Sequence, residues 1–322
     1  MKRLVKPIIS IVILAILFYV LPFREVLNAV RSVNPAIWFG SLGLFLFGHI
    51  LGAIKWRLML RIGGARLEAL TTIKCYAAGL FSNLCLPTVV GGDVVRATLA
   101  GRATGKLEAV FLGGIADRLI DICATGLLIL AGGLIAGSGL PGWQGELLIP
   151  VMIIIAGAAS FFAFVMLRRF RLWPRPIRRR FIRVLRVLQS YLRNPGKTLL
   201  ALAFSVLIQS LFIISNIWLG RSMGIEISNA AWFLTWPLAK LAGMLPISVG
   251  GIGVRDATLT ALLQGFNVPA AQGLAVSLSW QSVLIVGGLL SGLIWILIDR
   301  LSKRTLQVSP GSALIAGSTS KN

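Results

Sequence analysis

Residues 86–96 read LPTVVGGDVVR, and residues 245–255 read LPISVGGIGVR. Seven of the eleven positions are identical at a constant offset of 159 residues. The shared residues include a proline, a glycine pair and a final arginine, which chance pairing of two apolar segments rarely aligns together. We therefore interpret the chain as two homologous halves, each built around one copy of this stretch.

The composition indicates that both copies lie in a membrane. Hydrophobic residues make up 57% of the chain, charged residues only 13%, and the mean hydropathy is +0.87, values typical of an integral membrane protein. A net charge of +22 would suggest nucleic-acid binding in a soluble protein. Here the basic residues cluster between apolar runs, where they orient helices and face anionic lipid head groups. The sequence predicts an all-α, polytopic integral membrane protein that does not bind nucleic acid.

The apolar runs predict about six full transmembrane helices, at residues 8–21, 36–54, 107–136, 147–167, 198–219 and 270–298. The first is read as an uncleaved span because Pro22 and Arg24 follow it, not a small-residue cleavage site. Lys55, Trp56 and Arg57 are interpreted as interfacial residues that close the second span. With both termini cytoplasmic, most basic residues face the cytoplasm, as the positive-inside rule requires. We expect a multi-pass protein of the cell (inner) membrane.

Two shorter apolar runs precede the repeated stretches. A helix over residues 75–87 covers only about 20 Å of a hydrocarbon core of about 30 Å. We expect it to enter the bilayer, end at Pro87, break at Gly91 and Gly92, and return as a second short helix. Residues 230–263 repeat this pattern. The sequence thus predicts two re-entrant helical hairpins, near 75–100 and 230–263, whose backbone protein or water must cover.

The predicted topology sends the two hairpins in from opposite faces, as inverted repeats of the kind that secondary transporters use. If each hairpin is instead a pair of full spans, the relative orientation changes. The expected organisation is a first half (1–167), a basic amphipathic connecting helix on the membrane surface (168–196), a second half (197–304) and a mobile tail (305–322).

The repeated stretch carries residues suited to an anion. A short helix after the glycine pair presents free N–H groups and the positive end of its dipole, and glycine lets a phosphate approach the backbone. Arg96 and Arg255 add guanidinium groups, and Asp93 and Asp256 would hold those arginines or compete for them. The alternative is that the glycines permit close helix packing and each arginine extends to water.

Charged residues also lie inside the predicted span 107–136. Asp117 and Asp121 are one helical turn apart with Arg118 beside them, and such charges are costly in lipid unless they face partners or a water-filled cavity. They indicate a polar path, with an ion pair near the cytoplasmic end of the helix as the alternative. Lys240 lies in the second short run. His49, the only histidine, is either a proton relay or hydrogen-bonded to a neighbouring helix.

Signals for enzyme chemistry are sparse. The sequence has no Gly-x-Ser-x-Gly, no histidine-containing metal motif, no dinucleotide fingerprint and no Walker loop. Cys75, Cys85 and Cys123 are single residues in apolar segments, which we interpret as small core residues. We expect no enzyme activity, no cofactor and no metal.

Three ordered motifs resemble those of the lysylphosphatidylglycerol synthase transmembrane-region family, over about residues 5–305. The first runs from Asn83 through Pro87 to Arg96, and the third from Leu245 through Ser248 to Asp256. The second spans 117–121. Asp117 and Asp256 stand where the family usually has glutamate, which keeps the charge but shortens the reach.

The resemblance implies a flippase-like domain that transfers a lipid with a charged head group between leaflets, with re-entrant helices lining the path. Larger members add a cytoplasmic aminoacyl-transferase domain. Nothing of that size follows residue 305, so synthase activity is not expected.

We therefore expect a flippase or transporter for a phospholipid or a polyprenyl-phosphate-linked lipid. The alternatives are a membrane enzyme or accessory subunit acting on lipid-linked substrates, and a small-solute secondary transporter. Anionic membrane lipids are the expected partners, and a lipid-modifying enzyme or a second copy of the chain stays open. The candidate substrate-binding residues are Asn83, Pro87, Gly91, Gly92, Asp93, Arg96, Asp117, Arg118, Asp121, Lys240, Ser248, Gly250, Gly251, Arg255 and Asp256.

Overall fold

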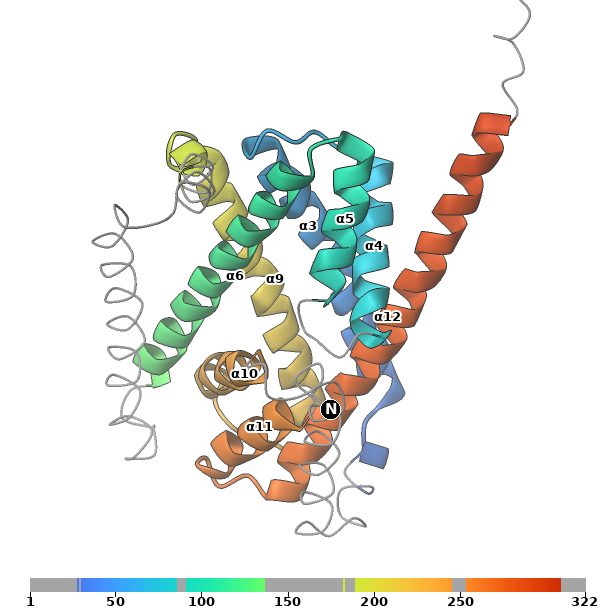
Figure 1. Cartoon of the computed structure of the whole chain (residues 1–322). Helices are drawn as coiled ribbons and strands as arrows, with labels where there is room; N and C mark the ends of the chain where they lie inside the picture. The colour runs from blue at the N-terminus through green and yellow to red at the C-terminus, as the bar shows by residue number, and fades with distance from the viewer. Residues whose placement is uncertain are drawn as a thin grey trace, which may run out of the picture.

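A computed structural model describes residues 28, 30–85, 91–136, 182, 189–244 and 253–307. Within these ranges every regular element is a helix (Figure 1). The elements are α3 (Pro35–Ile62), α4 (Ala69–Cys85), α5 (Gly91–Thr104), α6 (Leu107–Ala136), α9 (Pro195–Ser222), α10 (Asn229–Gly243), α11 (Val254–Gln264) and α12 (Ala270–Gln307).

Four of these helices are long and apolar enough to cross a membrane: α3, α6, α9 and the 270–301 part of α12, with lengths of 28, 30, 28 and 32 residues. Each exceeds the roughly 20 residues that a span needs. Apolar side chains such as Leu134, Ile135 and Leu199 point outward on them, as expected for helices that face hydrocarbon. The predicted spans 8–21 and 147–167, most of the connecting helix and the tail from residue 308 lie outside the described residues.

The helix starts follow from local sequence. Asn34 caps α3, with its Oδ1 accepting the Ala36 N–H at 2.8 Å and Pro35 at the first position. Ser228 caps α10 in the same way through the Ala231 N–H at 3.2 Å. Helix α6 has the bounds predicted for it.

Helix α3 differs from the prediction. It continues to Ile62, about two turns past the expected end at residue 54, so Lys55 and Trp56 lie within it. Their exposed fractions are 3% and 0%, and the assignment of these two residues to the membrane interface is wrong. An aromatic-basic pair suits a buried ion pair as well as an interface, and only the three-dimensional arrangement shows that carboxylates face Lys55. The core assignment of Cys123 is also wrong, because its side chain is exposed, whereas Cys75 is buried.

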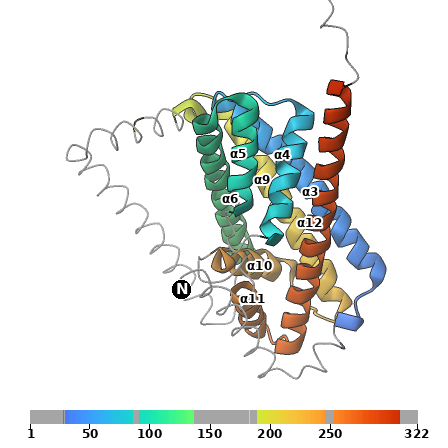
Figure 2. The same ribbon diagram turned by 45° about the vertical axis from the view of Figure 1, so that its right-hand side comes forward.

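Two pairs of shorter helices complete the bundle. Helices α4, α5, α10 and α11 have 17, 14, 15 and 11 residues, and even 17 residues extend only about 26 Å. Figures 1 and 2 both place the α4–α5 pair in the upper half of the bundle and the α10–α11 pair in the lower half. The segments 86–90 and 245–252 lie outside the described residues, and with them Pro87, Ser248, Gly250 and Gly251.

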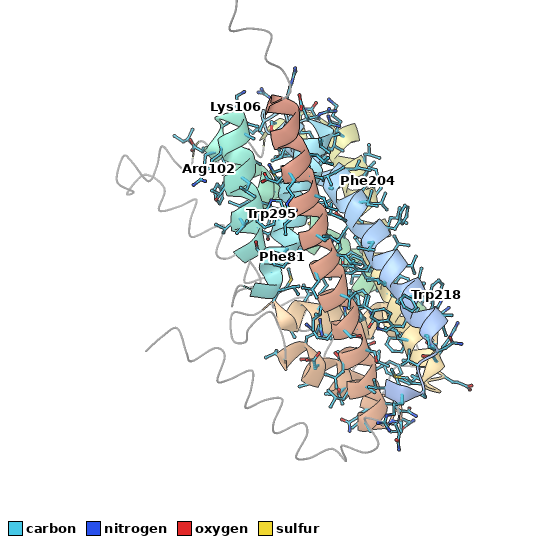
Figure 3. All side chains as sticks on the ribbon, turned by 90° about the vertical axis from the view of Figure 1, so that its right-hand side faces the viewer. Phe81, Arg102, Lys106, Phe204, Trp218 and Trp295 are labelled. Carbon is cyan, nitrogen blue, oxygen red and sulfur yellow. The ribbon has the colours of Figure 1, made fainter. Side chains whose placement is uncertain are left out.

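Glycines permit the closest helix contacts. A Cβ atom built at Gly79 of α4 would lie 2.8 Å from the Gly92 carbonyl oxygen and 3.0 Å from the Arg96 Cβ. The backbones of α4 and α5 can therefore approach only because no side chain separates them. Helix α12 packs on the outer side of α4, where Phe81 faces Trp295 with ring centroids 6.3 Å apart (Figure 3).

The α6–α10 contact generates a stability prediction. A Cβ at Gly132 would lie 2.7 Å from the Phe233 carbonyl carbon and 2.8 Å from the Leu234 nitrogen. Both are backbone atoms of a helix, which can move apart only at a substantial cost in free energy. We expect Gly132→Ala to destabilise the protein by about 1–3 kcal/mol, as overpacking does, seen as a lower midpoint of thermal unfolding in detergent. Gly126→Ala on the same helix is the matched control, because nothing lies within 4 Å of its Cβ position. Equal midpoints for the two variants would contradict the α6–α10 contact.

Candidate functional site

The centre of the bundle holds a buried ion network around Asp117. Its Oδ2 accepts a hydrogen bond from Arg96 Nη2 of α5 at 3.1 Å, and its Oδ1 lies 2.9 Å from Lys55 Nζ of α3. The residues are 3%, 7% and 3% exposed, respectively. Charges this far from water interact strongly with one another, so the Asp117 carboxylate joins α3, α5 and α6.

Lys55 directs its hydrogen bonds to other acceptors. Its Nζ donates to Asp121 Oδ1 at 2.5 Å and to Ser205 Oγ of α9 at 3.0 Å, while its contact with Asp117 is an ion pair. Asp117 Oδ1 is paired with the Lys55 ammonium at 2.9 Å. A buried carboxylate needs such a partner, because an unpaired buried charge is strongly destabilising.

The network has a more accessible edge at the start of α5. Asp93 Oδ1 lies 3.1 Å from Arg96 Nε, and Asp93 Oδ2 accepts a hydrogen bond from Arg118 Nε at 2.7 Å. The Asp93 and Arg118 side chains are 19% and 34% exposed. Arg96 is also held from its other side, with its guanidinium carbon 5.0 Å from the ring centre of Trp56 and 5.3 Å from that of Tyr76.

Polar contacts continue from Asp121 to the second pair of short helices. Gln209 of α9 donates its Nε2 to Thr125 Oγ1 at 2.7 Å and to the Asp121 carbonyl at 3.2 Å. Its Oε1 accepts a hydrogen bond from Lys240 Nζ at 2.6 Å. Side chains from α5, α6, α3, α9 and α10 thus form one connected chain from Asp93 to Lys240.

The second copy of the motif forms a separate group. Arg255 Nη2 donates to Asp256 Oδ1 at 2.9 Å and to Gln281 Oε1 of α12 at 2.8 Å. Asp256 is fully buried and also accepts a hydrogen bond from Ser277 Oγ at 2.5 Å. In the described part of the chain, no hydrogen bond or ion pair joins this group to Asp117. Arg255 Nε is buried and finds no acceptor there.

The structure qualifies the expectation of free N–H groups at the two motif helices. The Gly92 N–H donates to Asn83 Oδ1 at 2.9 Å, and the Gly253 N–H donates to Asp256 Oδ2 at 2.9 Å. Both donors are therefore occupied by side chains of the chain itself. Asn83 lies where the motif predicts a site residue, but its contact is a helix cap. Gly91 and Gly92 are buried, and Gly92 lies at the α4–α5 contact.

Sequence reasoning missed four members of the network: Lys55, Thr125, Ser205 and Gln209. Apolar residues resume after Lys55 at positions 58–60, a signal that the span continues past it. Ser205 and Gln209 are four residues apart in an apolar span, which places them on one helix face. His49 lies outside the network: its Nδ1 is 3.4 Å from Tyr76 Oη of α4, which agrees with the alternative of a contact to a neighbouring helix.

The network generates a second stability prediction. Lys55→Met removes the ammonium that faces Asp117 and Asp121, and breaking a buried pair costs about 3–5 kcal/mol. We expect a large drop in the midpoint of thermal unfolding in detergent, partly recovered by Lys55→Met/Asp121→Asn. Lys74→Met is the matched control, since its pair with Asp299 at 2.5 Å is 27% and 31% exposed and is worth about 0–1 kcal/mol. If Lys55→Met and Lys74→Met lowered the midpoint of thermal unfolding by similar amounts, the assignment of the network as buried would be wrong.

The comparison with known proteins identifies the same family as the motifs. Residues 3–292 match the model of the family described as Lysylphosphatidylglycerol synthase TM region. This match confirms the resemblance drawn from the three motifs. A search of curated proteins finds no match.

Proposed function

Since the chain belongs to the Lysylphosphatidylglycerol synthase TM region family, we propose that it is a lipid flippase or transporter, moving a lipid with an anionic head group between the two leaflets. The observation that carries this proposal is the buried ion network. Charges inside an apolar bundle are expensive and mark pathways for polar groups. Stability alone gives no reason for them, because well-packed apolar residues are often as stabilising as buried ion pairs.

The charge balance of the network favours an anionic guest. Its cations are Lys55, Arg96, Arg118 and Lys240, and its carboxylates are Asp93, Asp117 and Asp121. With all groups ionised, the cations exceed the carboxylates by one. Lys240 is the cation that has no carboxylate within ion-pair distance in the described residues; its ammonium lies over the Trp236 ring at 5.6 Å. A phosphate would neutralise this excess, with the acyl or prenyl chains remaining in the bilayer.

Exchange of ion-pair partners provides the conformational step. A phosphate competes with Asp93 and Asp117 for Arg96, because guanidinium binds both anions through the same N–H groups. Losing Asp117 as a partner of Arg96 removes one of the two charged contacts between α5 and α6, and leaves the contact between Asp93 and Arg118. Arg255, whose Nε has no acceptor among the described residues, would receive the head group at the second motif. The carboxylates return to the arginines once the head group leaves.

The topology that suits this function is a pair of re-entrant hairpins. In our proposal α4–α5 and α10–α11 enter from opposite faces of the cell membrane as inverted repeats, with both termini cytoplasmic, so the site opens to each side in turn. Support comes from their lengths, from their places in opposite halves of the bundle (Figures 1 and 2), and from the repeated sequence.

A leaflet-exchange assay tests the function. The full chain is reconstituted into vesicles containing a head-group-labelled phosphatidylglycerol, and access of a membrane-impermeant quencher to the label is followed. We expect Arg96→Gln and Arg255→Gln each to slow exchange about tenfold or more, since a hydrogen bond to a charged group is worth about 1.5–3 kcal/mol. Lys74→Gln, which removes a cation from the surface pair with Asp299, is expected to stay within about twofold of wild type. Wild-type rates for both arginine variants, each monodisperse in gel filtration, would overturn the proposal.

Cysteine labelling tests the topology independently of transport. In a background without Cys75, Cys85 and Cys123, single cysteines replace Ala103 at the end of α5 and Gln264 at the end of α11, both exposed. An impermeant maleimide added to sealed right-side-out vesicles is expected to label Gln264→Cys and to reach Ala103→Cys only after lysis. Labelling of both positions from one side would exclude inverted hairpins.

A further inference from the structure

A second basic feature lies at the upper end of the bundle, away from the buried network. The last turn of α3, the connection 63–68 and the end of α5 surround a pocket of about 410 Å³, lined by Arg61, Gly64, Arg66, Thr104 and Lys106. Figure 3 shows Lys106 at this end of the molecule, with Arg102 lower on α5. We propose that this pocket binds a phosphate group, as a site distinct from the Asp117 network.

The charge of the pocket is the first argument. Its described lining has three cations, Arg61, Arg66 and Lys106, and no carboxylate. None of the three forms an ion pair with an acidic residue elsewhere in the described chain. Cations placed together without acids repel one another, and an anion between them removes that repulsion. Arg61 and Arg66 supply planar guanidinium groups, whose paired N–H donors bind phosphate oxygens.

The pocket walls are fixed by contacts that do not need a ligand. Lys106 Nζ donates to the Gly64 carbonyl at 3.1 Å, which joins the two sides of the pocket. Arg57 Nε donates to the Leu67 carbonyl at 2.9 Å. Ala65 and Leu67 are buried in the same apolar cluster as Trp56 and Leu60. The backbone of the connection 63–68 is therefore anchored, and an anion has to order only the exposed side chains of Arg61, Arg66 and Lys106.

Two glycines shape the turns beside these cations. Gly64 has φ of +88° and Gly105 has φ of +65°, a conformation that glycine adopts without strain. Gly64 turns the chain between Arg61 and Arg66, and Gly105 turns it between Thr104 and Lys106. The positions of all three cations thus depend on backbone turns that other residues would strain.

The size and surroundings identify the ligand class. The pocket is open to solvent, and its volume of about 410 Å³ lies in the range of about 300–1,000 Å³ typical of small-molecule pockets, so it has room for a phosphate ester. Exposed Leu70 and Leu107 adjoin the rim in sequence, so the phosphate belongs either to a lipid head group with chains along these residues or to a soluble phosphate ester. Thr104 is eight residues beyond Arg96 on α5, about 12 Å along the helix. The inference therefore stands whether or not the network carries a lipid.

Binding to the full chain in nanodiscs tests the site in two arms. In the first arm, inorganic phosphate is titrated calorimetrically into nanodiscs of phosphatidylcholine. In the second arm, the nanodiscs contain both phosphatidylglycerol and phosphatidylcholine, and native mass spectrometry measures which of the two lipids the protein retains. We expect Arg61→Gln/Arg66→Gln to weaken binding about tenfold or more. Arg102→Gln, which removes an exposed cation on the same helix end that does not line the pocket, is expected to stay within about twofold.

Each outcome decides the matter. Binding that the double variant weakens assigns a soluble phosphate when it occurs in the first arm, a lipid head group when it occurs in the second, and the shared phosphate chemistry when it occurs in both. Absence of binding in both arms, an unaffected double variant, or equal weakening by Arg102→Gln would overturn the site. If the double variant does not fold by gel filtration, Lys106→Gln takes its place. Because leaflet exchange is not measured, failure here is separate from failure of the flippase proposal.

Discussion

The structure depends on one buried carboxylate held between two cations. Asp117 lies between Lys55 and Arg96, and no two of these three residues come from the same helix. In an apolar bundle the hydrophobic effect gives little preference for one helix arrangement over another, because lipid is as apolar as the helix interior. Directional ion pairs then decide which faces meet. The position of α5 against α3 and α6 follows from this constraint.

The two copies of the repeated motif use their charges differently. In the first, Arg96 shares its partner Asp117 with Lys55, and polar contacts extend through α9 as far as Lys240. In the second, Arg255 and Asp256 pair with each other and with Gln281 and Ser277. The same short motif therefore serves a shared network in one half and a self-contained group in the other.

The sequence predicted the all-helical fold class, the bounds of α6 and the family. These predictions rest on local signals, namely apolar runs, the residues that begin or end helices, and short motifs. It also singled out Asp93, Arg96, Asp117, Arg118 and Asp121 as candidate site residues, since charges inside apolar runs are conspicuous, and the structure brings these five into one ion network. It could not place Lys55, because a lysine near the end of a span looks the same whether it faces lipid head groups or a carboxylate 66 residues away. It could not show that Asn83 occupies the Gly92 N–H, because that bond joins two helices whose packing is set by Gly79.

The contact between Gly79 and Gly92 has a mechanical consequence. Backbone lies against backbone here, and the Asn83 amide is hydrogen-bonded across the contact. A sideways shift of α4 along α5 would bring backbone atoms into collision, so a displacement of one helix is expected to carry the other with it. The left-handed turns at Gly64 and Gly105 bound this helix pair at its two ends.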